Sequence, residues 1–143
     1  MEEVYKDRKV RLFKYVVMLF SFIVLFTGSA FADDNKILGF KVVSQTSNEL
    51  VIEVTYNYSG DHGDNVFIKV VPAIDRKSSR FFGYKPNRIS AGINTLTTKI
   101  KPNPKSKVPD GYTTNQLGIS MYVGGQGTFL APSYYDFEKN WSE

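Results

Sequence analysis

The chain has 143 residues, no cysteine and a formal charge of +4 at neutral pH, with 18 basic and 14 acidic side chains. The lack of cysteine excludes a disulfide framework, a thiolate metal site and a cysteine nucleophile. Its single histidine, His62, would need two or three carboxylates beside it to hold zinc.

The first 32 residues have the order of features of a secretory signal peptide. A basic segment (6–14) precedes an uninterrupted apolar run (15–26). Small residues follow, and Ala30-Phe31-Ala32 fits the Ala-x-Ala pattern that signal peptidase cleaves. We therefore expect residues 1–32 to be removed near Ala32/Asp33, leaving a mature protein in the periplasm or outside the cell.

The alternative is that the leader remains as a membrane anchor. A spanning helix needs roughly 20 apolar residues, whereas this run has about a dozen before the small residues begin. Because the basic flank stays in the cytoplasm, either version exports the C-terminal part. A bacterial lipid anchor would need a cysteine at the cleavage point, and the chain has none.

The part after the leader, 33–143, has the size of a single domain. Five of the basic and three of the acidic residues belong to the leader, so this domain has 13 basic and 11 acidic residues and a charge of +2. From Lys69 to Lys107 there are ten basic residues and one acid, Asp75. The domain is therefore electrically polarised along its sequence.

Alternation of apolar and polar residues predicts β-strands, and no stretch has sustained helical spacing. In chain order the predicted strands are Leu38–Val42, Leu50–Tyr58, Val66–Val70, a weaker edge segment Arg80–Tyr84, Leu96–Ile100, Leu117–Val123, and Phe129–Phe137 with an interruption at Pro132.

Turn-forming residues separate these strands. We expect hairpin turns at Ser47-Asn48 and Gly124–Gly127, a polar loop at Ser59–Asn65, and a stiff basic connection at Pro102–Pro109. Short strands with turn signals about every eight to twelve residues indicate an all-β, antiparallel sandwich of about seven strands.

Three segments carry a family resemblance. They are the strand Leu50–Tyr58, the segment Ile89–Leu96 leading into an alternating strand, and Asp110-Gly111-Tyr112 ahead of the strand Leu117–Val123. Their order resembles the immunoglobulin-like and fibronectin type III sandwiches of exported bacterial proteins, including adhesion-related modules of the CARDB kind. Tyr112 is similar to a tyrosine corner, although the cysteine pair of true immunoglobulin domains is absent.

The loop Ser59–Asn65 contains candidate ligands for calcium. Asp61, Asp64 and Asn65 supply hard oxygen atoms, and glycines allow carbonyl groups to turn inward. The same residue types form ordinary tight turns without any ion, which is the alternative. His62 has carboxylates beside it but no placed nucleophile, so we predict no catalytic residue.

A basic and aromatic segment, 76–88, is the first candidate contact surface. Its predicted binding residues are Arg76, Lys77, Arg80, Phe82, Tyr84, Lys85 and Arg88. Cations attract anions and rings stack on planar or sugar groups, so we expect an envelope protein or an anionic glycan as partner and no nucleic acid. Alternatively, the rings face the core and the basic residues protect a sheet edge.

A second aromatic group lies near the C-terminus and includes Tyr134, Tyr135 and Trp141. If exposed, these rings would form a carbohydrate platform or a docking patch; if buried, they would complete the core. We predict an exported, non-enzymatic binding module, with a carbohydrate-binding domain as the alternative. We expect no cofactor apart from the calcium alternative. We expect contact with a membrane only if the leader remains uncleaved.

Overall fold

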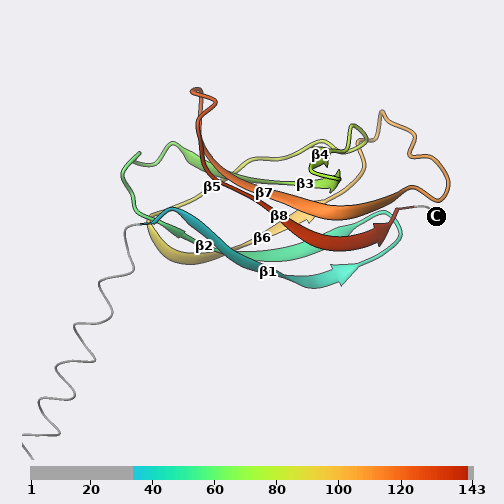
Figure 1. Ribbon diagram of the computed structural model, residues 1–143, viewed down its shortest axis with the longest axis horizontal. Helices are drawn as coiled ribbons and strands as arrows, with labels where there is room; N and C mark the ends of the chain where they lie inside the picture. Colours follow the sequence, from blue (N-terminus) through green and yellow to red (C-terminus); the bar gives the residue numbers. More distant parts are fainter. Residues whose placement is uncertain (1–33, 142–143) are drawn as a thin grey trace, which may run out of the picture. The chain divides into compact units, whose positions relative to one another are not determined.

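The computed structural model describes residues 34–141, which form eight β-strands and no helix (Figure 1). The strands are β1 (Lys36–Gln45), β2 (Leu50–Tyr58), β3 (Val66–Ile74), β4 (Lys77–Ser78), β5 (Asn87–Arg88), β6 (Gly92–Ile100), β7 (Thr113–Val123) and β8 (Phe129–Asn140). The all-β prediction is confirmed for this part of the chain, where no helix capable of crossing a membrane occurs. The predicted signal peptide, 1–32, lies outside the described residues.

The strands form two antiparallel sheets. One has the order β1-β2-β6, and the other has the order β4-β3-β7-β8 with β5 also paired to β3. Figure 1 shows the sheets as stacked layers, with β1 and β2 in one and β3 and β7 in the other. The chain crosses between the layers after β2, after β5 and after β6, so both sheets enclose one core.

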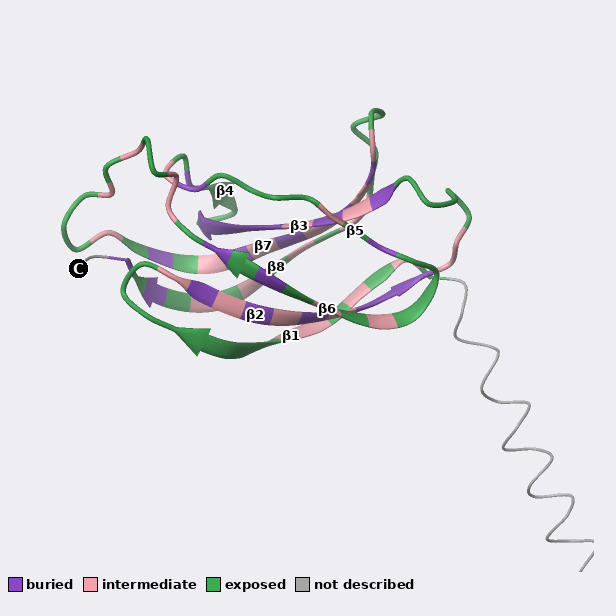
Figure 2. Cartoon of the chain, turned by 180° about the vertical axis from the view of Figure 1, so that it is seen from behind, coloured by how far each residue is buried: buried purple, intermediate pink, exposed green. Residues whose placement is uncertain are grey.

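Alternate side chains of the central strands form that core. Leu50, Ile52 and Val54 of β2 are fully buried, and Leu117 and Ile119 of β7 face them from the other sheet. Figure 2 shows the same alternation as short bands of buried and more accessible residues along β2. Burying one such side chain stabilises the fold by roughly 1.5–3 kcal/mol. The residues that must be buried therefore determine which residues of each strand face outward.

The last strand differs from its prediction at Pro132. We expected an interruption there, but β8 continues through Pro132, which pairs with Ser120 of β7. Proline has no N–H to donate to a neighbouring strand. Because β8 is an edge strand, one of its two sides has no neighbouring strand to hydrogen-bond with. A proline is tolerated in such a strand.

The predicted edge strand Arg80–Tyr84 is wrong. This segment is irregular and makes a single isolated bridge, from Phe82 to Pro102. Its two adjacent rings have different neighbours, because Phe82 packs on Trp141 with centroids 4.4 Å apart whereas Phe81 packs on Tyr112 at 4.8 Å. The segment therefore follows side-chain packing rather than a strand ladder.

Tyr112 connects two parts of the chain but does not form a tyrosine corner. Its hydroxyl donates to the side-chain oxygen of Ser79, 2.8 Å away, in the connection between β4 and β5. A tyrosine corner would instead place that bond on the backbone a few residues upstream. The carbonyl of Tyr112 also accepts a 2.8 Å hydrogen bond from the backbone N–H of Trp141.

The turn between β3 and β4 is strained. Asp75 and Arg76 have φ angles of 49° and 64°, in the left-handed region that costs a non-glycine residue roughly 1–2 kcal/mol. Two side chains of β7 offset this cost. The N–H of Asp75 donates to Oδ1 of Asn115 at 3.1 Å, and the N–H of Arg76 donates to Oε1 of Gln116 at 2.9 Å.

Arg76→Gly should therefore stabilise the protein by about 0.5–1 kcal/mol, because glycine adopts a positive φ without steric cost. The measurement is the free energy of unfolding in urea. Lys85→Gly is the matched control, since Lys85 is an exposed basic residue without a positive φ. If the free energy of unfolding falls by the same amount in both variants, the positive φ at Arg76 does not destabilise the protein as described.

Candidate binding surface

The two sheets present different outer faces. On the β1-β2-β6 face, Thr55 and Thr95 approach each other with side-chain oxygens 3.5 Å apart, and Lys41 pairs with Glu53 at 2.8 Å. The outer face of the β3-β7-β8 sheet instead carries aromatic rings and cations. Aromatic residues and arginine are enriched where proteins meet their partners, so the second face is the candidate surface.

One row of paired residues crosses this second face from edge to edge. Arg88 of β5 pairs with Phe67 of β3, Phe67 pairs with Tyr122 of β7, and Tyr122 pairs with Phe129 of β8. We call these four residues the aromatic rung. They share one side of the sheet because directly opposed residues point to the same face.

Two rings of the aromatic rung are stacked, whereas the third, Phe129, is inclined by 51° to Tyr122. The Arg88 guanidinium lies 5.6 Å from the Phe67 centroid, and the Phe67 and Tyr122 rings are 5.9 Å apart and inclined by 29°. Since β5 and β7 flank β3, Arg88 and Tyr122 approach Phe67 from opposite sides of its strand. The Phe67 ring is therefore only partly exposed.

Lys69 lies among three rings beside the rung. Its ammonium nitrogen is 4.9 Å from the centroid of Phe129, 5.0 Å from that of Tyr84 and 5.7 Å from that of Tyr122. We call this arrangement the Lys69 cage. Each such contact contributes roughly 0.5–1 kcal/mol near the surface, so Lys69 fastens the Tyr84 segment and the start of β8 to the middle of the sheet.

Two glycines allow the rings to lie close to the backbone. A Cβ at Gly124 would meet the Phe67 ring at 2.7 Å and Oδ1 of Asn65 at 2.6 Å. At Gly118 the ring of Tyr134 occupies the space above the backbone, 3.2 Å from where a Cβ would be. Tyr134 therefore extends the aromatic face along β8.

The cations of this face have no acidic partner among residues 34–141. In that range Lys41 pairs with Glu53, and both Lys99 and Lys101 pair with Glu49. Two more ion pairs lie in the loop Ser59–Asn65 and at the start of β1. None involves Lys69, Arg88 or another basic residue of 76–88. Their positive charge is therefore available to an external anion.

The structure brings three of the predicted contact residues together on this face: Tyr84, Arg88 and Tyr134. Tyr84 and Tyr134 are 54% and 43% exposed. Arg76 and Lys77 lie at the opposite end of β3 from Phe67, and Arg80 lies over Phe81 at 5.1 Å. Lys85 is exposed in the connection that also carries Tyr84.

Two predicted stacking residues are buried instead. Phe82 and Trp141 are 6% and 2% exposed and pack on each other inside the sandwich. Tyr135 is half-buried against Phe40, with centroids 5.5 Å apart, and its hydroxyl donates to the carbonyl of Ile37. Tyr134, Tyr135 and Trp141 therefore do not form the exposed platform that the carbohydrate alternative requires.

The candidate calcium ligands do not converge. Nδ2 of Asn65 donates to the carbonyl of Gly124 at 2.9 Å, whereas the Asp61 carboxylate faces Nδ2 of Asn35 at 3.5 Å. The buried hydroxyl of Tyr58 donates to the carbonyl of Gly63 and accepts from the N–H of His62. Within residues 34–141 no cluster of three acidic or histidine side chains could hold a metal ion.

Four important residues of the surface were not singled out from the sequence: Phe67, Lys69, Tyr122 and Phe129. A local signal existed for two of them. Phe67 and Tyr122 occupy outward positions between inward apolar residues, so these stretches are apolar on both faces. Large rings at the outward positions of these strands indicate that the outer face of the sheet is also apolar.

No family model and no curated protein matches the chain. Function is therefore inferred from the surface itself.

The tyrosine at the centre of the rung gives a pH-dependent prediction. Burial, and secondarily repulsion from Tyr84, raises the pKa of Tyr122 above its usual 10.0. The folded state thus favours the neutral phenol. Its contribution to stability is present below pH 10.0 and is lost as the pH rises through the folded-state pKa.

Tyr122→Phe should therefore make the free energy of unfolding fall less steeply above pH 10.0 than in the unchanged protein. Denaturant unfolding at a series of alkaline pH values measures the slope. Tyr134→Phe, on the same face, controls for the loss of a hydroxyl. Identical slopes for Tyr122→Phe and the unchanged protein would contradict the assignment.

Proposed function

We propose that this protein is an exported, non-enzymatic binding module of the bacterial cell envelope, and that the outer face of the β3-β7-β8 sheet contacts an anionic partner. The observation that carries the proposal is the aromatic rung with the Lys69 cage. Rings and cations gathered on one outer face supply contact area and charge for a partner, which favours binding over catalysis. Export is inferred from the basic, apolar and Ala-x-Ala order of the leader.

We also infer an immunoglobulin-like connectivity. Immunoglobulin constant domains place strands A, B, E and D in one sheet and C, F and G in the other. Taking β1, β2, β3, β6, β7 and β8 as A, B, C, E, F and G gives sheets A-B-E and C-F-G, with β4 beside C. This order supports the resemblance to exported fibronectin type III and CARDB-type sandwiches, an architecture that hosts many functions.

Among anionic partners, an acidic envelope protein fits the surface best. The Phe67 ring lies between Arg88 and Tyr122 within the rung, which restricts the access of a sugar ring to it. Phe129, 51% exposed, and Tyr84 present apolar area beside the Lys69 ammonium. Partly exposed rings next to unpaired cations match a protein segment in which acidic and apolar side chains alternate.

The test uses immobilised poly-L-glutamate as the acidic polypeptide, polygalacturonate as the anionic glycan and dextran as the neutral polymer. We expect the purified protein to bind poly-L-glutamate most tightly, and binding to weaken as salt screens the charges. Arg88→Glu should weaken that binding about tenfold, equivalent to about 1.4 kcal/mol. Equilibrium binding at two salt concentrations gives the values.

Lys105→Glu is the matched control. Lys105 is exposed, has no ion pair among the described residues, and lies in the β6–β7 connection away from the rung. Reversing the charge of Lys105 should change the affinity for poly-L-glutamate by less than about twofold. Equal losses from both reversals would show a response to net charge and would contradict the proposed surface. Tighter binding to polygalacturonate would assign the surface to a glycan.

A further inference from the structure

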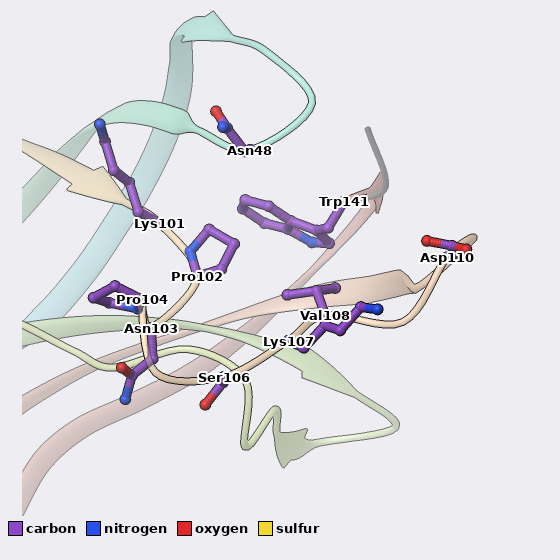
Figure 3. A pocket seen from close by; sticks show the side chains of 10 residues that line it. All are labelled: Asn48, Lys101, Pro102, Asn103, Pro104, Ser106, Lys107, Val108, Asp110 and Trp141. Atoms are coloured by element: carbon purple, nitrogen blue, oxygen red, sulfur yellow. The ribbon is translucent and has the colours of Figure 1, made fainter.

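A pocket, drawn in Figure 3, is lined by residues of the β1–β2 turn and the β6–β7 connection, at the other end of β8 from the aromatic rung. It has a volume of about 420 Å³ and is formed by the β1–β2 turn, the β6–β7 connection and Trp141, which follows the last residue of β8. Phe129 of the rung begins β8, so the whole strand separates the two places. The volume falls within the range of roughly 300–1,000 Å³ typical of small-molecule sites.

The floor of the pocket is apolar and fixed, and the buried Trp141, 2% exposed, contributes only a small part of its ring to it. Figure 3 shows the rings of Trp141 and Pro102 with Val108 at the centre of the site. The Trp141 N–H donates to Oγ1 of Thr114 at 2.9 Å, and its ring packs on Phe82. The indole therefore needs no polar partner from the pocket and cannot easily turn away.

The connection that forms one wall is also ordered. Oδ1 of Asn103 accepts from the N–H of Lys105 at 3.0 Å, and the Asn103 carbonyl accepts from the N–H of Ser106 at 2.8 Å. Pro102 and Pro104 flank this turn and restrict its backbone further. The pocket is thus formed before a ligand arrives, which lowers the entropy cost of binding.

The rim carries two lysines and one carboxylate. Lys101 is already engaged, with its ammonium 2.7 Å from Glu49, and Figure 3 shows it directed away from Trp141. Lys107 makes no ion pair with any described residue. Asp110 lies at the far side of the view from Lys101, on the side toward which the Lys107 side chain extends. Lys107 is therefore the cation available to a ligand resting on the apolar floor.

We propose that this pocket binds a small ligand with an apolar body and one carboxylate. The apolar body lies against Pro102, Val108 and Trp141, and the carboxylate pairs with Lys107. A peptide ending in an aliphatic residue and a free branched carboxylic acid share this chemistry. The site is independent of the proposed function, because it involves no residue of the aromatic rung or the Lys69 cage.

Trp141 is the only tryptophan of the chain, so tryptophan fluorescence reports on the surroundings of this one side chain, which lines the pocket. The purified protein is titrated with N-acetyl-L-leucine, with its amide, which lacks the carboxylate, and with 4-methylpentanoate, which lacks the peptide group. We expect a saturable change in emission with N-acetyl-L-leucine and at least tenfold weaker binding of the amide. Binding of 4-methylpentanoate would extend the site to free acids; its failure to bind would restrict it to peptide ends.

Lys107→Glu should weaken binding of N-acetyl-L-leucine about tenfold, because the carboxylate then meets a like charge. Lys105→Glu, in the same connection but outside the pocket, should change it by less than about threefold. Thermal unfolding of each variant without ligand checks that both remain folded. Arg88→Glu should leave this binding unchanged, which separates the test from that of the proposed function.

Three results would overturn the proposal. The first is the absence of both a fluorescence change and a rise in melting temperature with N-acetyl-L-leucine on the order of 10 mM, since a ligand of the folded state must raise stability. The second is equal affinity for the acid and its amide. The third is an equal loss of binding in Lys107→Glu and Lys105→Glu.

Discussion

The single register in which β3 pairs with β7 is the constraint on which the aromatic face depends. That pairing runs without a shift from Val66↔Val123 to Ala73↔Gln116. Because the inward residues of both strands are buried in the core, their neighbours must face outward, and Phe67 meets Tyr122 there. A slip of one residue would move the whole inward set to the solvent side and take the rings into the core, so core packing and surface chemistry are fixed together.

A buried lysine holds the opposite end of the sandwich. The ammonium of Lys139 donates to the carbonyl of Thr46 at 2.6 Å and lies 4.5 Å from the Trp141 ring centroid. It thereby joins the end of β8 to the β1–β2 turn of the other sheet. Burial lowers the pKa of Lys139, so part of the interaction energy offsets the loss of hydration. The same contact holds the indole that forms the pocket floor.

Local sequence determines much of the fold but little of the surface. Alternation identifies β2 with its observed ends, because the period of two is a property of each strand alone. The aromatic rung cannot be found in this way, since Arg88, Phe67, Tyr122 and Phe129 come from four strands and only cross-strand pairing brings them together. The burial of Phe82 and Trp141 has the same origin, because each ring is covered by the other. Pattern and spacing contain no information on such distant partners.

The crowding at Gly124 has a practical consequence for tracking a bound partner. The first residue of the β7–β8 turn admits no side chain, whereas a Cβ at Gly125 or Gly127 would meet nothing within 4 Å. Gln126, exposed between them, is thus a place where a dye can be attached without lifting the Phe67 ring. Since the chain has no cysteine of its own, a thiol introduced there would be unique and would carry its reporter to the border of the aromatic face.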